Sequence, residues 1–278
     1  MKYILLCFSA IFATVGFAAT SSEIKVSFTP DCIDYVSGER IRGVVDVLNA
    51  SPRKVSVGYA NSKDKLLIEI FRADDRSQIE KTSSSPVTAR FVIEPNQGQK
   101  LEVFLADHYP LLEERRYLVR PVLVHEGHRY EGMTRTINIV TGMKQAAALQ
   151  LFEGRDELRR HFELVKWSRN GTDHIFLTAR DEGSRWRNWV TTDLGSFLRV
   201  TPPVISIMPS GVVTVLHRFD PETFVRSEFW SVPQGLELVS REKVQDPETA
   251  GQNRVRELYN TPGNEIKPPK RRWWEIWK

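Results

Sequence analysis

The chain has 278 residues, of which 27% are charged and 41% hydrophobic, a composition typical of globular proteins rather than disordered ones. Its formal net charge of +4 comes from the C-terminal end, because residues 266–278 hold five basic residues and one acidic residue, leaving 34 of each sign in residues 1–265. A nucleic-acid-binding domain would carry a basic face on its fold. We therefore expect no nucleic-acid partner.

The first 18 residues have the parts of a removable signal peptide. Lys2 supplies a positive charge, residues 4–17 are apolar or small, and Gly16 and Ala18 precede a cleavage site after Ala18. The stretch is shorter than the roughly 20 apolar residues of a spanning helix. We expect export to the periplasm or the cell surface. A membrane anchor and a lipid at Cys7 are the disfavoured alternatives.

Cleavage after residue 18 leaves a single cysteine, Cys32, in a compartment that permits disulfides. An intramolecular disulfide is then impossible, so the fold must be held together by its apolar core. We interpret Cys32 as a small, half-buried apolar side chain near the end of a strand. A reactive or intermolecular thiol is the alternative.

Between residues 23 and 142 the apolar residues alternate in short runs that end at turn residues, as in β-strands. Seven or eight such runs within about 115 residues predict a β-sandwich. The runs are residues 24–28, 41–49, 55–59, 66–72, 88–93, 100–105, 117–124 and 128–140.

Two features of this region resemble a known superfamily. Residues 44–49 run out to an Asn-Ala-Ser turn, and Tyr117 begins a late strand after a polar segment. In both respects residues 23–140 resemble the immunoglobulin-like superfamily, where a tyrosine at this place forms the tyrosine corner. The cysteine pair of antibody domains is missing, and Val119 stands at one of its positions. The resemblance implies a fold and no binding residues.

We place a domain boundary between residues 142 and 143. Residues 143–245 contain three predicted hairpins, and the Asn170-Gly171 pair is the strongest hairpin signal. A closed propeller takes at least four blades, so we expect a second antiparallel β module, either a meander or a sandwich. The Ala-rich residues 144–151 are predicted as a helical or strand-like connection.

Residues 246–278 are predicted to form a flexible Pro-rich linker with a basic, Trp-rich tail. Tryptophan favours the bilayer interface, and each basic residue near an anionic surface adds about 1 kcal/mol. We expect the tail to contact an anionic membrane surface or a partner, with folding back onto the body as the alternative. Its contact residues are Lys270, Arg271, Arg272, Trp273, Trp274 and Trp277.

Motifs for catalysis, cofactors or metals are not evident in the sequence. The segment from His125 to His128 is the most metal-like, but strand alternation places these two histidines on opposite faces unless the turn twists them together, and a third ligand at motif spacing is missing. We interpret it as a solvent-exposed hairpin tip. Because nucleophile elbows and phosphate-binding loops are also missing, we expect no enzyme activity, metal or cofactor.

A cluster of tryptophan and arginine precedes the segment 190–192. Trp186 and Trp189 are the candidate ligand-binding residues, together with Arg185 and Arg187. Exposed indoles stack on sugar rings or peptides, and guanidinium groups add hydrogen bonds and cation–π contacts. Burial of one of these tryptophans in the core is the alternative.

These observations favour a non-enzymatic, exported protein that serves as an interaction or scaffold component of the cell envelope. Its expected partners are an envelope protein or a surface glycan. Two alternatives stay open. The first is a carbohydrate-binding protein that uses the Trp and Arg cluster, and the second is a hydrolase whose carboxylates meet only in three dimensions.

Overall fold

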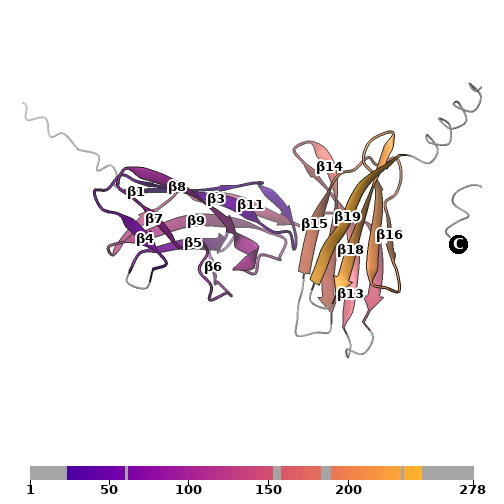
Figure 1. Ribbon diagram of the computed structural model, residues 1–278, viewed down its shortest axis with the longest axis horizontal. Coiled ribbons are helices and arrows are strands. Elements are labelled where there is room, and N and C mark those ends of the chain that lie inside the picture. Colours follow the sequence, from indigo (N-terminus) through magenta and orange to yellow (C-terminus); the bar gives the residue numbers. More distant parts are fainter. Residues whose placement is uncertain (1–23, 60–61, 153–157, 183–188, 233–234, 246–278) are drawn as a thin grey trace, which may run out of the picture.

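The computed structural model describes residues 24–59, 62–152, 158–182, 189–232 and 235–245 (Figure 1). These residues form nineteen strands and one short 3-10 turn, η1 (Leu105–Asp107), which confirms the predicted all-β class. A helix able to span a membrane is not found among them. The predicted signal peptide, the tail 246–278 and residues 185–187 lie outside the described residues.

The first module consists of two sheets that enclose one core (Figure 1). One sheet has the order β1-β3-β8 and the other the order β2-β11-β9-β5-β6, with β10 beside β9, while β4 and β7 form a separate pair. Neighbouring strands are antiparallel except β2 and β11. The strands are β1 (Ile24–Pro30), β2 (Asp34–Val36), β3 (Arg42–Asn49), β4 (Val55–Val57), β5 (Lys65–Arg72), β6 (Gln78–Ile79), β7 (Phe91–Ile93), β8 (Gln97–Phe104), β9 (Arg115–His125), β10 (His128–Glu131) and β11 (Arg135–Val140).

The core of this module follows from the alternation in its strands. β1 buries Ile24, Val26 and Phe28 and exposes the residues between them. Tyr117 is also buried, and its hydroxyl donates to the carbonyl of Glu113 at 3.3 Å. The bond runs back to a carbonyl four residues upstream, which is the direction that the bond takes in a tyrosine corner. Membership of the immunoglobulin-like superfamily stays a prediction.

The second module is a sandwich of two four-stranded sheets, β12-β13-β14-β15 and β16-β17-β18-β19. Their inner faces share a core that includes Phe162 and Leu177 from the first sheet and Val215 and Phe229 from the second. Residues 143–151 form an edge strand rather than a helix. The strands are β12 (Met143–Leu151), β13 (Arg159–Arg169), β14 (Thr172–Glu182), β15 (Trp189–Ser196), β16 (Val204–Ile207), β17 (Val212–Arg218), β18 (Thr223–Val232) and β19 (Gly235–Gln245).

The hairpin predicted at Asn170-Gly171 is confirmed. β13 and β14 pair up to Arg169 and Thr172, and the two turn residues have φ angles of 52° and 78°. Two positive φ angles define the type I′ turn, whose twist matches that of the flanking strands.

The predicted arrangement of His125 and His128 is wrong. Glu126 and Gly127 alone form the turn, with φ angles of 50° and 83°, so the two histidines are directly paired and share one face. His125 is also not a solvent-exposed tip residue, because it is 6% exposed and its Nδ1 lies 3.0 Å from Asp64. His128 is exposed.

Candidate functional site

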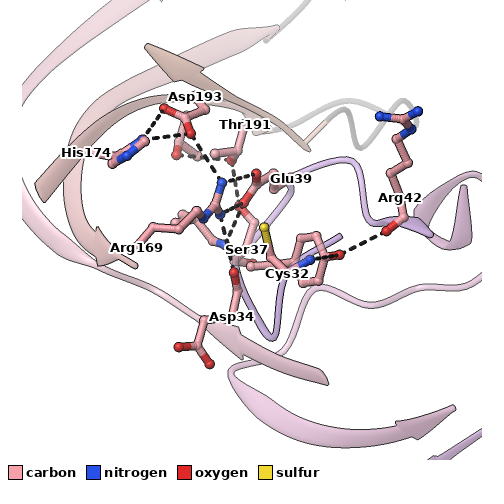
Figure 2. A network of polar contacts seen from close by, with 12 residues as sticks. Cys32, Asp34, Ser37, Glu39, Arg42, Arg169, His174, Thr191 and Asp193 are labelled. Atoms are coloured by element: carbon pink, nitrogen blue, oxygen red, sulfur yellow. Dashed lines mark hydrogen bonds and ion pairs between the residues drawn. The ribbon is translucent and has the colours of Figure 1, made fainter. Parts of the chain in front are cut away.

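The two modules meet at a set of polar residues that we call the junction network (Figure 2). It consists of Asp34, Ser37, Gly38, Glu39, Arg169, Thr191 and Asp193.

A backbone segment of the first module pairs with the edge strand of a sheet in the second module. The turn after β2 lies beside β15, and Glu39 and Thr191 form a parallel bridge. The Thr191 N–H donates to the Gly38 carbonyl at 2.9 Å, and its hydroxyl donates to the Ser37 carbonyl at 2.6 Å. An exposed sheet edge is a template for unwanted pairing, so this turn also covers part of the β15 edge.

Gly38 is required at this turn for two reasons. Its φ angle is +83°, in the left-handed region that favours glycine. A Cβ atom here would lie 2.3 Å from Cδ1 of Trp189. The indole of Trp189 therefore packs against the turn, and the Arg180 guanidinium lies 5.5 Å from its ring centroid.

This packing bears on the candidate ligand-binding cluster. Trp189 is half-buried, so only part of its ring is available to a ligand. Arg185, Trp186 and Arg187 lie outside the described residues.

Arg169 is the central residue of the network (Figure 2). At the C-terminal end of β13, its guanidinium makes two bonds to the Glu39 carboxylate, at 2.7 and 3.1 Å. It also donates to Asp193 at 3.2 Å and to the Asp34 carbonyl at 3.3 Å. Bidentate pairing of arginine with a carboxylate is geometrically specific and stronger than a neutral hydrogen bond.

The ion pair between Arg169 and Glu39 is sheltered from water, because each side chain is 13% exposed. Burial tends to lower the pKa of Arg169, but the hydrogen bonds and the charge of Glu39 outweigh it, so the pKa lies above its ordinary value. Coulombic attraction is stronger where water is excluded. Because sheltering also adds a desolvation cost, the clearest consequence is that removing one partner, which leaves an uncompensated charge, should cost more here than in an exposed pair.

An apolar layer lies beside the ion pair. Val36 from the first module packs with Val165 and Phe176 from the second, and Val140 and Trp167 cover this group. The Arg169 guanidinium lies 5.1 Å from the Phe176 ring centroid. The junction thus combines backbone pairing, a sheltered ion pair and apolar contact.

Cys32 lies near this network without the properties of a nucleophile. Its thiol is half-buried and packs against the first core, which confirms the interpretation of a half-buried residue. Burial raises the pKa of the Cys32 thiol, and the charge of Arg169 only partly opposes this. The thiolate is the reactive form of cysteine, and the raised pKa disfavours that form at neutral pH.

His174 and Asp193 resemble the acid–base pair of a hydrolase, but their other contacts indicate a structural role. Nδ1 of His174 lies 3.0 Å from the Asp193 carboxylate. That carboxylate also accepts bonds from Arg169 and from the Gly195 N–H at 2.6 Å. Within the described ranges, His, Cys, Asp and Glu do not gather in threes to hold a metal ion.

The sequence does not point to the junction network. Glu39 and Arg169 are 130 residues apart, and neither belongs to a short motif. The only local signals are the turn at residues 37–39 and the hairpin at Asn170-Gly171, which place the two side chains at element ends.

Comparisons with known proteins do not identify a family for this chain. No family model matches the chain, and no curated protein matches it. Among solved structures the chain is similar to Spo0M, a sporulation control protein from Bacillus subtilis, at 12% sequence identity and a TM-score of 0.29. That match covers 85% of this chain and 96% of the other.

Proposed function

We propose that this protein is a non-enzymatic, exported interaction or scaffold component of the cell envelope. The observation that supports it is the junction network. In this network two β-sandwiches are joined by backbone pairing and a sheltered ion pair. Two modules joined in this way are suited to holding binding surfaces at a set distance.

Two pairs of carboxylates, each pair bound by one arginine, favour this function over the hydrolase alternative. Arg169 binds both Glu39 and Asp193, and Arg120 binds both Glu69 and Glu131, at 2.7 and 2.9 Å. A carboxylic acid that donates a proton at neutral pH needs a raised pKa.

The pKa of Glu69 is shifted in the opposite direction. Its burial raises the pKa, but the hydrogen bonds from Arg129 and Arg120 outweigh that effect and lower it. Glu69 is therefore ionised at neutral pH and serves as an anchor for the two guanidinium groups.

The test is fractionation and photo-cross-linking in the native cells. We expect the chain to be cleaved after Ala18, to be recovered with the envelope and to form a reproducible cross-linked complex. An uncleaved cytosolic protein would contradict export. Turnover of peptide, ester or glycoside substrates by the purified protein would contradict the non-enzymatic function.

Trp230 supports glycan binding as a second candidate function. It is 54% exposed on β18, where it pairs with Val212 and Glu237 across the sheet. A flat exposed indole can stack on a sugar ring. We expect a glycan-array signal that is lost in Trp230→Ala and kept in Val204→Ala, another exposed apolar site. A signal unchanged in Trp230→Ala would exclude this surface.

A further inference from the structure

A groove lies along one edge of β5 in the first module. β5 pairs with β9 over its whole length, but on its other side it pairs with β6 only at Ile70 and Phe71. Among the described residues, no strand pairs with the edge between residues 65 and 69, and the pairing nearest to its N-terminal end is the parallel bridge between Val57 and Asp64. The groove is formed by this edge together with β4, β6, Tyr109 and the segment 81–87.

The direction of the backbone groups along this edge follows from two hydrogen bonds. The Arg72 N–H donates to Ser77 on the β6 side, whereas the Ala73 N–H donates to Arg116 on the β9 side. Because backbone groups alternate sides along a strand, the N–H groups of Leu66 and Ile68 point into the groove. The Tyr109 hydroxyl donates to the Ile68 carbonyl at 2.5 Å from that side, which confirms the direction.

The N–H groups of Leu66 and Ile68 and the Leu66 carbonyl thus face the groove, and the two residues as a whole are 7% and 3% exposed. Neither strand pairing nor any other hydrogen bond from the described part of the chain occupies them. Recognition of an extended peptide by an open sheet edge takes its affinity from such main-chain groups and its specificity from pockets for alternate side chains.

The side chains that line the groove supply those pockets and a charge preference. Val57, Ile79, Pro86 and Val87 form an apolar lining.

Of the charged groups at the rim, both carboxylates are already engaged. Glu69 binds two arginines, and Asp64 accepts the Ser56 N–H at 2.9 Å. Lys65 is exposed and has no acidic partner among the described residues. The free charge at the groove is therefore positive, which suits an acidic occupant and opposes the basic tail of this chain.

We propose that the β5 groove binds an extended peptide segment of a partner protein, which adds to β5 as a further strand. The segment carries apolar side chains at alternate positions, seated against Val57, Ile79 and Val87, and a carboxylate that faces Lys65. This proposal rests on the proposed interaction function and names the chemistry of one partner.

The test uses random linear peptides displayed on phage and selected against the full chain, followed by fluorescence anisotropy with the enriched peptides. We expect enriched peptides to combine alternating apolar residues with Asp or Glu. Ser84→Trp, at an exposed residue lining the groove, should weaken binding at least tenfold. Ser85→Trp, at the exposed neighbour outside the lining, should leave it unchanged. Lys65→Glu should weaken binding up to about fivefold, as expected for an exposed ion pair.

Amide hydrogen exchange tests the main-chain pairing directly. Bound peptide should slow exchange at Leu66 and Ile68, and exchange at Leu67, whose N–H already points to β9, should not change. Enrichment of basic peptides, equal binding by Ser84→Trp, or unchanged exchange at Leu66 and Ile68 would each overturn the proposal.

Two further outcomes separate the possible occupants and functions. If the chain cut after Gln245 binds the peptides at least tenfold tighter than the full chain, the tail already occupies the groove and the partner peptide is the wrong occupant. If Ser84→Trp keeps the envelope complexes of the intact protein, the groove proposal fails while the interaction function stands. Loss of all complexes in the unaltered protein would refute the interaction function itself.

Discussion

The substitution Arg160→Met should destabilise the second module strongly. Arg160 is 1% exposed on β13 and makes two bonds to the fully buried Asp181 carboxylate, at 2.6 and 3.0 Å. Its Nη1 donates to the Ser231 hydroxyl and to the carbonyls of Val232 and Gly235 at 2.8–2.9 Å. One guanidinium thus joins the two sheets of the sandwich.

The cost follows from the charge that the substitution leaves behind. Without Arg160, no other cation among the described residues pairs with the buried Asp181 carboxylate, and breaking a buried ion pair from one side costs about 3–5 kcal/mol. A domain is stable by only about 5–15 kcal/mol, so the loss is a large fraction. Replacing both residues, as Arg160→Met with Asp181→Leu, should cost less than Arg160→Met alone, because no unpaired charge remains.

Urea unfolding followed by tryptophan fluorescence measures these differences. Arg226→Met is the matched control, because Arg226 and Glu242 form a pair whose side chains are 47% and 51% exposed, and such pairs contribute about 1 kcal/mol or less. The reasoning is refuted if Arg160→Met costs no more than Arg226→Met, or if the double variant is as unstable as the sum of its single variants.

Three further outcomes are expected. His217 is fully buried and its pKa is lowered to about 4, chiefly by burial. Because His217 binds a proton at higher pH in the unfolded state than in the folded state, the free energy of unfolding should fall by about 3 kcal/mol as the pH drops from 6.5 through 4. His217→Leu should remove this pH dependence of the urea midpoint. Tyr117→Phe should cost about 1 kcal/mol through loss of its bond to Glu113, and no change in the denaturation midpoint would argue against the corner. Gly38→Ala should lower the melting temperature, because its Cβ meets Trp189 at a positive φ angle; an unaltered melting temperature would contradict that contact.

Much of the fold was predictable because its signals are local. Alternation in β1 identifies Ile24, Val26 and Phe28 as core residues, and Asn170-Gly171 identifies a hairpin because few other pairs adopt two positive φ angles. The sequence of the Ala-rich strand β12 does not distinguish a helix from a strand, because alanine packs in both and the apolar residues follow no clear period.

The features that sequence reasoning missed depend on geometry between distant residues. His125 and His128 share a face because a two-residue turn makes its flanking residues direct partners, an effect that alternation along a single strand does not describe. Arg169 and Glu39 lie in different modules, so their contact depends on how the two modules dock. The sequence separation of Arg169 and Glu39 does not predict this contact.

The most direct test of the fixed arrangement of the two modules is the distribution of distances between spin labels at Ser27 and Glu237, two exposed sites in different modules, measured by double electron–electron resonance. The junction network predicts a single narrow distribution. The distance distribution should broaden in Glu39→Arg, because this substitution places two guanidinium groups face to face. It should narrow again when Arg169→Glu is added, because opposite charges then face each other. A distribution that is already broad in the unaltered protein, or that stays equally narrow in Glu39→Arg, would contradict the claim that this ion pair holds the modules together.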